Sequence, residues 1–405
     1  MRAVAIICEY NPFHRGHAYQ IACARRDSGA DAVICIMSEQ LTQRGEMAIA
    51  DPYHRARAAV CGGADIVLGL PFPYSGAAAE HFAAAGVHIA TALCATHLHF
   101  GSECGDLASL QTAATLVNTP EFIAQLTAMQ HEHPELGVMQ ARELLLQRTL
   151  GKQAFPDGAN DLLGLAYLAA IEKQQSPLIP MTTRRVGQAY RDDTQTTDIF
   201  ASASALRRLW RENGSLHALA DQLPRDSYDA LCRATDQGLA PTDADRLSVA
   251  AQSFLRLADP DRMAACAELG GGIAQRLITT AQEAAYSHLS ELISAASTKR
   301  YTNARLWRAL WFAFCGVKPS DLTAPPAYTR LLGCSERGRA YLASVRKCAA
   351  IDLLTKPSDI PKTSAAARQY ALEQAFAALY TLALPLPRPA GYFLRSRPYL
   401  SGATP

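Results

Sequence analysis

The first hundred residues alternate short apolar runs with helix-like segments, and this alternation restricts the fold more than any other feature of the sequence. The apolar runs have the length of buried strands, and segments of helical character separate them. The runs are residues 3–8, 31–37, 65–70 and 97–100, and the expected helices are residues 17–26, 53–61 and 77–92. Strands that alternate with helices form right-handed crossovers and a parallel sheet. We therefore predict an α/β fold.

A polar or glycine-containing cluster follows each predicted strand. The clusters are Glu9-Tyr10-Asn11, Ser38-Glu39-Gln40, Pro71-Phe72-Pro73-Tyr74 and Gly101-Ser102-Glu103. Parallel sheets of this kind bind their ligands beyond the carboxyl ends of the strands. We expect this edge of the sheet to be the active face.

The rest of the chain divides into three parts. Residues 107–175 look helical, residues 177–190 look like a further strand and its exit, and a helix over 202–213 closes a first domain of residues 1–213. Residues 214–295 have a helical pattern without a chemical motif, which predicts a connector. Residues 296–405 are expected to be mainly helical, and residues 296–348 hold ten Lys and Arg against two acidic residues. A basic region interleaved with aromatic residues favours a nucleic-acid partner.

Composition excludes several other classes. The eleven cysteines show no CxxC pair and no regular spacing, so they indicate neither a zinc knuckle nor a disulfide framework but reduced thiols. The first apolar run is too short for a signal-peptide core, and no apolar stretch approaches the roughly 20 residues that span a bilayer. We expect a cytoplasmic protein with no membrane partner.

Two histidines and a glycine stand where the first strand should give way to a helix, in HRGH at residues 14–17. Backbone N–H groups and the positive helix end favour an anion at such a turn. Gly16 permits close approach, and His14 and His17 would lie on one helix face, within reach of the same phosphate. Histidine can donate hydrogen bonds to phosphate charge that grows during displacement. An incidental pair or a metal site is the alternative, and the position in the first strand-to-helix turn favours phosphate.

HRGH resembles the HxGH signature of the nucleotidyltransferase superfamily, whose members join an acid or phosphate to AMP and release pyrophosphate. Other stretches resemble, in order, the successive blocks of the tRNA(Met) cytidine acetate ligase family. They are EYNPFHRGH, MSEQLTQRGE, GADIVLGLPFPYS, HFGSECGD, ANDLLGLAYL, RRVGQAY, SASALR, KRYTNARLWR and PAYTRLLG, and they cover most of residues 1–340. The resemblance implies a Rossmann-like catalytic domain. It also implies a ligase that activates acetate with ATP as acetyl-adenylate and acetylates N4 of the wobble cytidine of elongator tRNA(Met).

The resemblance also carries site residues onto this chain. His14 and His17 are expected to be catalytic and to stabilise the α-phosphate and the departing pyrophosphate. The expected ATP contacts are Ile7, Cys8, Glu9, Tyr10, Asn11, Pro12, Phe13, His14, Arg15, Gly16, His17, Ala18, Tyr19, Gln20, Gly101, Asn160 and Arg185, with Ser204 and Arg207 of SASALR as secondary candidates. Mg²⁺ is expected with ATP, held mainly by phosphates and water, and no protein ligand is assigned to it.

Each single residue also has a structural interpretation. Gly101 could be an ordinary strand-end turn glycine, Asn160 a helix cap, and Arg185 a solvated charge. A simple N-cap by Ser202 or Ser204 is the alternative for SASALR.

The second substrate would explain the basic region. Lys299, Arg300, Arg305, Arg308 and Arg330 are expected to contact tRNA phosphates, and neighbouring aromatic residues could stack on unpaired bases. Trp and Phe at helical spacing are more often core residues, so the basic side chains are the stronger candidates.

The sequence departs from the family at Glu39, Pro52 and Gly69, where members usually show Gly, Lys and an acidic residue. A divergent nucleotidyltransferase that adenylates another small acid or a phosphate substrate, or that acts on another tRNA, is therefore an alternative. Enzymes resembling pantetheine-phosphate adenylyltransferase are usually much shorter and do not need the basic region. A nonenzymatic RNA-binding protein is a further alternative, against which the intact histidines argue.

Overall fold

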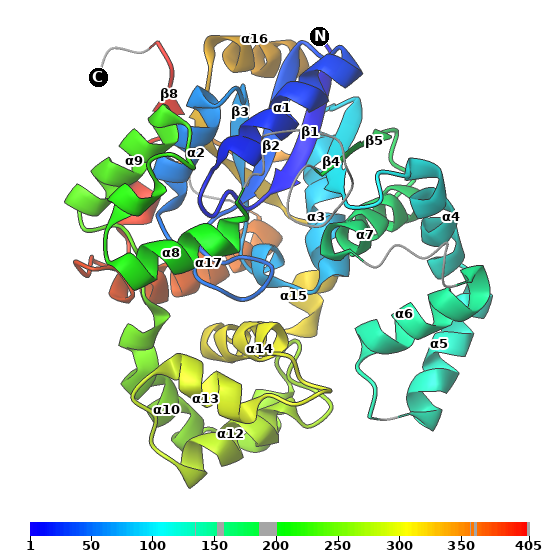
Figure 1. Cartoon of the computed structure of the whole chain (residues 1–405), viewed down its shortest axis with the longest axis vertical. Helices are drawn as coiled ribbons and strands as arrows, with labels where there is room; N and C mark the ends of the chain where they lie inside the picture. Colours follow the sequence, from blue (N-terminus) through cyan, green and yellow to red (C-terminus); the bar gives the residue numbers. More distant parts are fainter. Residues whose placement is uncertain (134, 152–157, 186–200, 357, 360–362, 403–405) are drawn as a thin grey trace.

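Five parallel strands form the centre of the computed structural model, which describes residues 1–133, 135–151, 158–185, 201–356, 358–359 and 363–402 (Figure 1). The strands are β1 (Ala3–Cys8), β2 (Ala32–Ser38), β3 (Ile66–Leu70), β4 (His97–Ser102) and β5 (Ile179–Arg184), in the spatial order β5-β4-β1-β2-β3. All five predicted strands are confirmed. The predicted exit of the last one, residues 186–190, lies outside the described residues.

Helices cover both faces of this sheet. Val4 and Ile6 of β1 belong to one apolar core together with residues of α1 and α2, whereas Ala5 and Ile7 belong to a second core with residues of α3 and α7. These helices are α1 (Arg15–Ser28), α2 (Pro52–Cys61), α3 (Ala79–Ala92) and α7 (Ala159–Lys173). Burial on both faces explains why the strands read as continuous apolar runs rather than alternating ones.

The direction of strand addition reverses beside β1. After β3 the chain crosses to the other side of β1, so that β4 pairs with β1 from the flank opposite β2. A crevice opens at such a reversal outside the carboxyl ends of the strands. The turn after β1, which carries HRGH, and the carboxyl end of β4, which carries Gly101, therefore flank this point.

Helices α4 to α6 form an arm at the side of the sheet (Figure 1). They are α4 (Leu107–Val117), α5 (Pro120–Glu132) and α6 (Val138–Leu150), and they share a small apolar core that includes Phe122 and Leu146. The helical character predicted for residues 107–175 is confirmed where the chain is described.

The middle of the chain is helical, as predicted for residues 214–295. Two elements lie before this part of the chain: η1 (Tyr74–Gly76) between β3 and α3, and α8 (Ala203–Asn213) directly ahead of it. The elements of the middle part are η2 (Leu216–Leu219), α9 (Arg225–Asp236), η3 (Ala244–Leu247), α10 (Ser248–Leu257), α11 (Pro260–Ala264), α12 (Ile273–Glu283) and α13 (Leu289–Ala296). Helix α9 packs on α2, while α10, α12 and α13 group with α14 at the bottom of Figure 1. No helix in the described part of the chain is both long and apolar enough to cross a membrane.

The C-terminal region is mainly helical, but it also extends the central sheet. Its elements are α14 (Asn303–Cys315), α15 (Pro319–Thr323), β6 (Tyr328–Cys334), α16 (Glu336–Val345), β7 (Asp352–Leu354), α17 (Ser364–Leu382), η4 (Phe393–Arg395) and β8 (Tyr399–Leu400). Strand β6 pairs antiparallel with β3, and β7 and β8 pair with β6. Strands β6, β7 and β8 therefore belong to the same sheet as the strands of residues 1–213.

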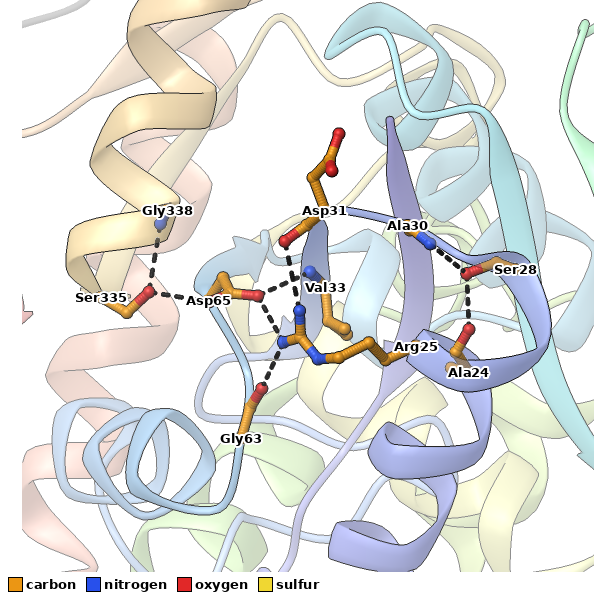
Figure 2. A network of polar contacts seen from close by, with 10 residues as sticks. All are labelled: Ala24, Arg25, Ser28, Ala30, Asp31, Val33, Gly63, Asp65, Ser335 and Gly338. Atoms are coloured by element: carbon orange, nitrogen blue, oxygen red, sulfur yellow. Dashed lines mark hydrogen bonds and ion pairs between the residues drawn. The ribbon is translucent and has the colours of Figure 1, made fainter. Parts of the chain in front are cut away.

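A polar network fastens the C-terminal region to the amino ends of the strands (Figure 2). The carboxylate of Asp65 pairs with Arg25 of α1, and it accepts hydrogen bonds from the backbone of Val33 at 2.9 Å and from Ser335 Oγ at 2.9 Å. Arg25 also donates to the Gly63 carbonyl at 3.0 Å. Because Ser335 opens α16, this network joins α1, β3 and α16 at the end of the sheet opposite HRGH.

Candidate active site

The histidines of HRGH cap helix α1 with their own side chains. His14 is the N-cap, and its Nδ1 accepts a hydrogen bond from the Gly16 backbone at 3.1 Å. His17 Nδ1 accepts from the His14 backbone at 3.3 Å, so the two imidazoles complete a reciprocal capping box. Their rings stack with centroids 3.7 Å apart. Because each Nδ1 is an acceptor, each neutral ring carries its proton on Nε2.

Burial keeps both imidazoles neutral. Burial and, second, the nearby charge of Arg185 lower the pKa of His14 to about 4. Burial lowers the pKa of His17 well below its ordinary value, with further contributions from His14 and Arg185. At neutral pH the pair therefore presents two Nε2–H donors at the start of α1. No hydrogen bond uses either Nε2 within the described residues.

Three of the predicted ATP contacts meet at the ends of β4 and β5. Arg185 Nη1 donates to Asn160 Oδ1 at 2.7 Å. A Cβ added to Gly101 would lie 3.2 Å from Arg185 Cγ, and Gly101 does not have a positive φ. A side chain at this position would press on Arg185, whereas the backbone conformation of Gly101 does not itself demand glycine. Asn160 lies in the first turn of α7, whose N-cap is Gly158, so the helix-cap interpretation of Asn160 is wrong.

Two carboxylates hold this cluster, Glu103, which the sequence analysis placed only in the polar cluster after the fourth strand, and Asp161, which it did not name as a site residue. Glu103 accepts hydrogen bonds from the backbone of Asn160 at 3.1 Å and of Asp161 at 2.9 Å, and also from the Asn160 side-chain amide. Asp161 accepts in return from the backbone of Glu103 at 2.9 Å and from the Ser102 hydroxyl. The loop after β4 and the start of α7 therefore fix each other. Both residues lie in blocks that resemble the family, HFGSECGD and ANDLLGLAYL, and this was the signal in the sequence that could have identified them.

A buried arginine, Arg55, holds the carboxyl ends of two strands. Arg55 is buried and donates to the carbonyls of Glu9 at 2.7 Å, Ser38 at 3.0 Å and Glu39. It thereby fixes the carboxyl ends of β1 and β2. Sequence reasoning missed Arg55 because a buried arginine leaves no periodic signal.

The SASALR residues make hydrogen bonds within the protein. Arg207 is 8% exposed and donates to the Asn11 carbonyl at 2.8 Å and to Glu46 at 2.6 Å, so it holds the turn that precedes His14. Ser202 is the N-cap of α8, which confirms the capping alternative. Ser204 is exposed, and its Oγ lies 3.1 Å from Ser202 Oγ.

The other positions of the predicted ATP stretch divide by exposure. Ile7, Cys8, Tyr10 and Phe13 pack in the two cores beside the sheet. Asn11 and Pro12 are also buried; Glu9, Gly16, Ala18 and Gln20 are partly exposed, and Arg15 and Tyr19 are exposed. The partly exposed and exposed positions therefore present most of the solvent-accessible surface of this stretch.

The five predicted tRNA contacts also separate into two groups. Lys299 and Arg300 are exposed and Arg305 is partly exposed. Arg308 and Arg330 are 9% and 7% exposed, and each faces a carboxylate, Arg308 with Glu268 at 2.8 Å and Arg330 with Glu373 at 3.6 Å. The expectation that these two contact tRNA is therefore corrected, because contact with a phosphate would require each to leave a buried ion pair. Trp311 and Phe312 lie in the core, as the structural interpretation expected.

Glu39 and Gly69, two of the three departures from the family pattern, lie against each other. A Cβ on Gly69 would lie 2.1 Å from Glu39 Oε1, so the carboxyl group of Glu39 fills the space above Gly69. Burial and, second, the charge of Glu373 raise the pKa of Glu39 to about 8. Pro52 opens α2 after the N-cap Asp51, a position that suits proline.

The residues around HRGH offer no ready protein site for a cation. Within the described residues, no group of three or more His, Cys, Asp or Glu side chains could hold a metal ion. The neutral histidines and Arg185 are instead arranged to receive an anion.

The chain is similar to known proteins over most of its length. The model of the HIGH Nucleotidyl Transferase family matches residues 1–390. A tRNA(Met) cytidine acetate ligase of Acetivibrio thermocellus is 32% identical over 377 residues, which cover 90% of each chain. Another, of Syntrophotalea carbinolica, is 35% identical over 370 residues, which cover 89% of this chain and 86% of the relative.

A solved structure gives the same assignment. The crystal structure of Thermotoga maritima TmcAL bound with α-thio-ATP is similar to this chain with a TM-score of 0.87, at 27% sequence identity and over 99% of both chains. Together with the family match and the relatives, this similarity extends over nearly the whole chain. The chain belongs to the tRNA(Met) cytidine acetate ligase family of the HIGH nucleotidyltransferases.

Proposed function

We propose that this chain is an ATP-dependent ligase that activates acetate as acetyl-adenylate and transfers the acetyl group to N4 of the wobble cytidine of elongator tRNA(Met). The product is N4-acetylcytidine. The relatives' names support this substrate pair. The observation that carries the proposal is the pair of neutral imidazoles at the mouth of the first crossover, with Arg185 nearby.

In the first step a carboxylate oxygen of acetate attacks the α-phosphorus of ATP. The new O–P bond forms as the bond to the bridging oxygen breaks, and pyrophosphate leaves. His14 and His17 donate from Nε2 to phosphate oxygens whose negative charge grows in the transition state. Because each Nδ1 already accepts a backbone N–H, each ring is held with its Nε2–H available to the phosphate.

Arg185 supplies a fixed guanidinium for the phosphates, and the amide of Asn160 holds that guanidinium in place. Gly101 leaves room for this arrangement. Mg²⁺, expected with ATP, would neutralise phosphate charge when bound. We assign it no protein ligand, and every other role falls to the chain's own residues.

In the second step the N4 amine of cytidine attacks the carbonyl carbon of acetyl-adenylate, the amine nitrogen loses one proton to solvent, and AMP leaves with the electrons of the broken C–O bond. We propose that Lys299, Arg300 and Arg305 contact the tRNA backbone, because these three remain accessible. Since tRNA is a cytoplasmic substrate, we place the enzyme in the cytoplasm.

Two measurements test the proposal. Acetate-dependent ATP–pyrophosphate exchange should occur without tRNA, and mass spectrometry of nucleosides should find N4-acetylcytidine after elongator tRNA(Met) is added. A transcript with uridine at the wobble position lacks the amine and should remain unmodified. Exchange with another small acid in place of acetate would identify a divergent adenylating enzyme. If no acid supported ATP–pyrophosphate exchange, the proposal would be overturned and a nonenzymatic RNA-binding protein would be the remaining alternative.

A further inference from the structure

Two cysteines from distant parts of the chain meet outside the candidate active site. Cys94 lies in the turn between α3 and β4, at the amino ends of the strands, and Cys348 lies between α16 and β7. Their sulfur atoms are 2.9 Å apart. Cys94 is partly exposed and Cys348 is exposed, so reagents in solution can reach the pair.

The surrounding backbone holds the two thiols together. The Ala350 backbone N–H donates to the Ala92 carbonyl at 2.7 Å. The buried Tyr341 hydroxyl lies 2.9 Å from the carbonyls of both Leu93 and Cys94. Hydrogen bonds on either side of the cysteines thus join the same two segments, and the thiols do not have to find each other by diffusion.

We propose that Cys94 and Cys348 are a modification site, at which a low-molecular-weight disulfide such as oxidised glutathione converts the thiol pair into a reversible intrachain disulfide. The bond joins the turn after α3 to the segment after α16. It lies at the end of the sheet opposite HRGH and does not depend on the proposed function.

The two cysteines have different parts in this exchange. Cys348 is the more exposed of the two, so glutathione disulfide reaches its sulfur atom first. Its thiolate attacks one sulfur of glutathione disulfide, the glutathione S–S bond breaks, and one glutathione thiolate leaves. Burial and, second, the hydrogen bond to Cys348 raise the pKa of Cys94 to about 11, so Cys94 keeps its proton until this stage.

The second exchange completes the bond. Cys94 loses its proton to solvent and attacks Cys348 Sγ, the mixed disulfide breaks, and a second glutathione thiolate leaves. The protein loses two protons and two electrons, and the glutathione disulfide becomes two glutathione thiols. No other oxidant is needed.

Mass spectrometry of the full-length wild-type protein tests the proposal. After incubation with oxidised glutathione, a non-reducing digest should contain one peptide pair joined through Cys94 and Cys348, and dithiothreitol should remove it. The Cys94→Ser variant should stop with glutathione attached to Cys348, and the Cys348→Ser variant should leave Cys94 unmodified. Cys61→Ser, which removes another exposed cysteine, should cross-link as the wild type does.

The oxidised protein should also melt at a higher temperature than the reduced one, because the cross-link restricts the unfolded chain. Wild-type protein in which Cys348 carries glutathione while Cys94 is still alkylated by iodoacetamide would overturn the proposal. So would cross-links between separate chains, or two cysteines that both remain fully alkylated after treatment.

Discussion

The two ends of the central sheet use polar side chains in opposite ways. At the amino ends, the charged groups of Arg25 and Asp65 are occupied by each other and by backbone and hydroxyl partners (Figure 2). At the carboxyl ends, His14 and His17 use Nδ1 to cap α1 and keep Nε2–H for another partner. A polar group can therefore serve a ligand when one of its atoms fixes its position and another remains available.

The largest expected effect tests whether the histidines act on the α-phosphate. His17→Ala should lower acetate-dependent ATP–pyrophosphate exchange by about 10²–10³-fold, the usual cost of one lost transition-state donor. Binding of tRNA should be nearly unchanged. His97→Ala, at the amino end of β4, is the matched control and should retain exchange. Unchanged exchange in folded His17→Ala protein would remove the catalytic role of His17.

Two arginines should separate ligand binding from stability. Arg185→Ala removes a guanidinium proposed for phosphate, so KM for ATP should rise roughly 10-fold or more, as for a charge-assisted hydrogen bond. Arg25→Ala leaves Asp65 without its counter-ion, so Tm should fall while KM stays constant. Steady-state kinetics and calorimetry on both variants measure this. If Arg185→Ala lowered Tm and left KM for ATP unchanged, Arg185 would have only a structural role, as Arg25 does, and the proposed phosphate contact would be refuted.

Exposed and buried basic residues of the C-terminal region should also differ. Lys299→Glu with Arg300→Glu should weaken tRNA binding several-fold and reduce its salt dependence, while ATP–pyrophosphate exchange stays constant. Arg330→Gln should instead lower Tm, because Glu373 then remains buried without its partner. Binding curves at several salt concentrations distinguish the two groups. Equal effects of both sets on tRNA affinity would contradict the division by burial.

The smallest expected effect is a pH dependence of stability. Burial holds the pKa of His14 at about 4 in the folded chain, below its value of roughly 6.5 when unfolded. The unfolded chain therefore binds an extra proton between these values, so this contribution to stability is complete above pH 6.5 and is lost as the pH falls towards 4. The Tm of wild-type protein should drop more steeply across this range than that of His14→Gln. Parallel curves would show that His14 does not titrate in this way.

Local signals in the sequence determined much of the fold. The apolar runs predicted β1 to β4, because burial on both faces leaves a continuous pattern in the sequence itself, whereas β5 is an edge strand that is only partly buried. HRGH could be placed at the first turn because capping depends on neighbours a few residues apart. The proximity of Gly101, Asn160 and Arg185 followed from the family resemblance, and the hydrogen bond between Arg185 and Asn160 agrees with it.

Only the tertiary structure decided which charged groups are available. The sequence shows Arg300 and Arg330 as members of one basic region, yet the first is exposed and the second is buried against Glu373 of α17. The pairing of β6 with β3 and the support of Asn160 by Glu103 likewise join segments that are distant along the chain. The physical reason is that secondary structure follows from short-range pattern. Whether a polar side chain is paired within the protein or available to a ligand depends on the elements that pack against it.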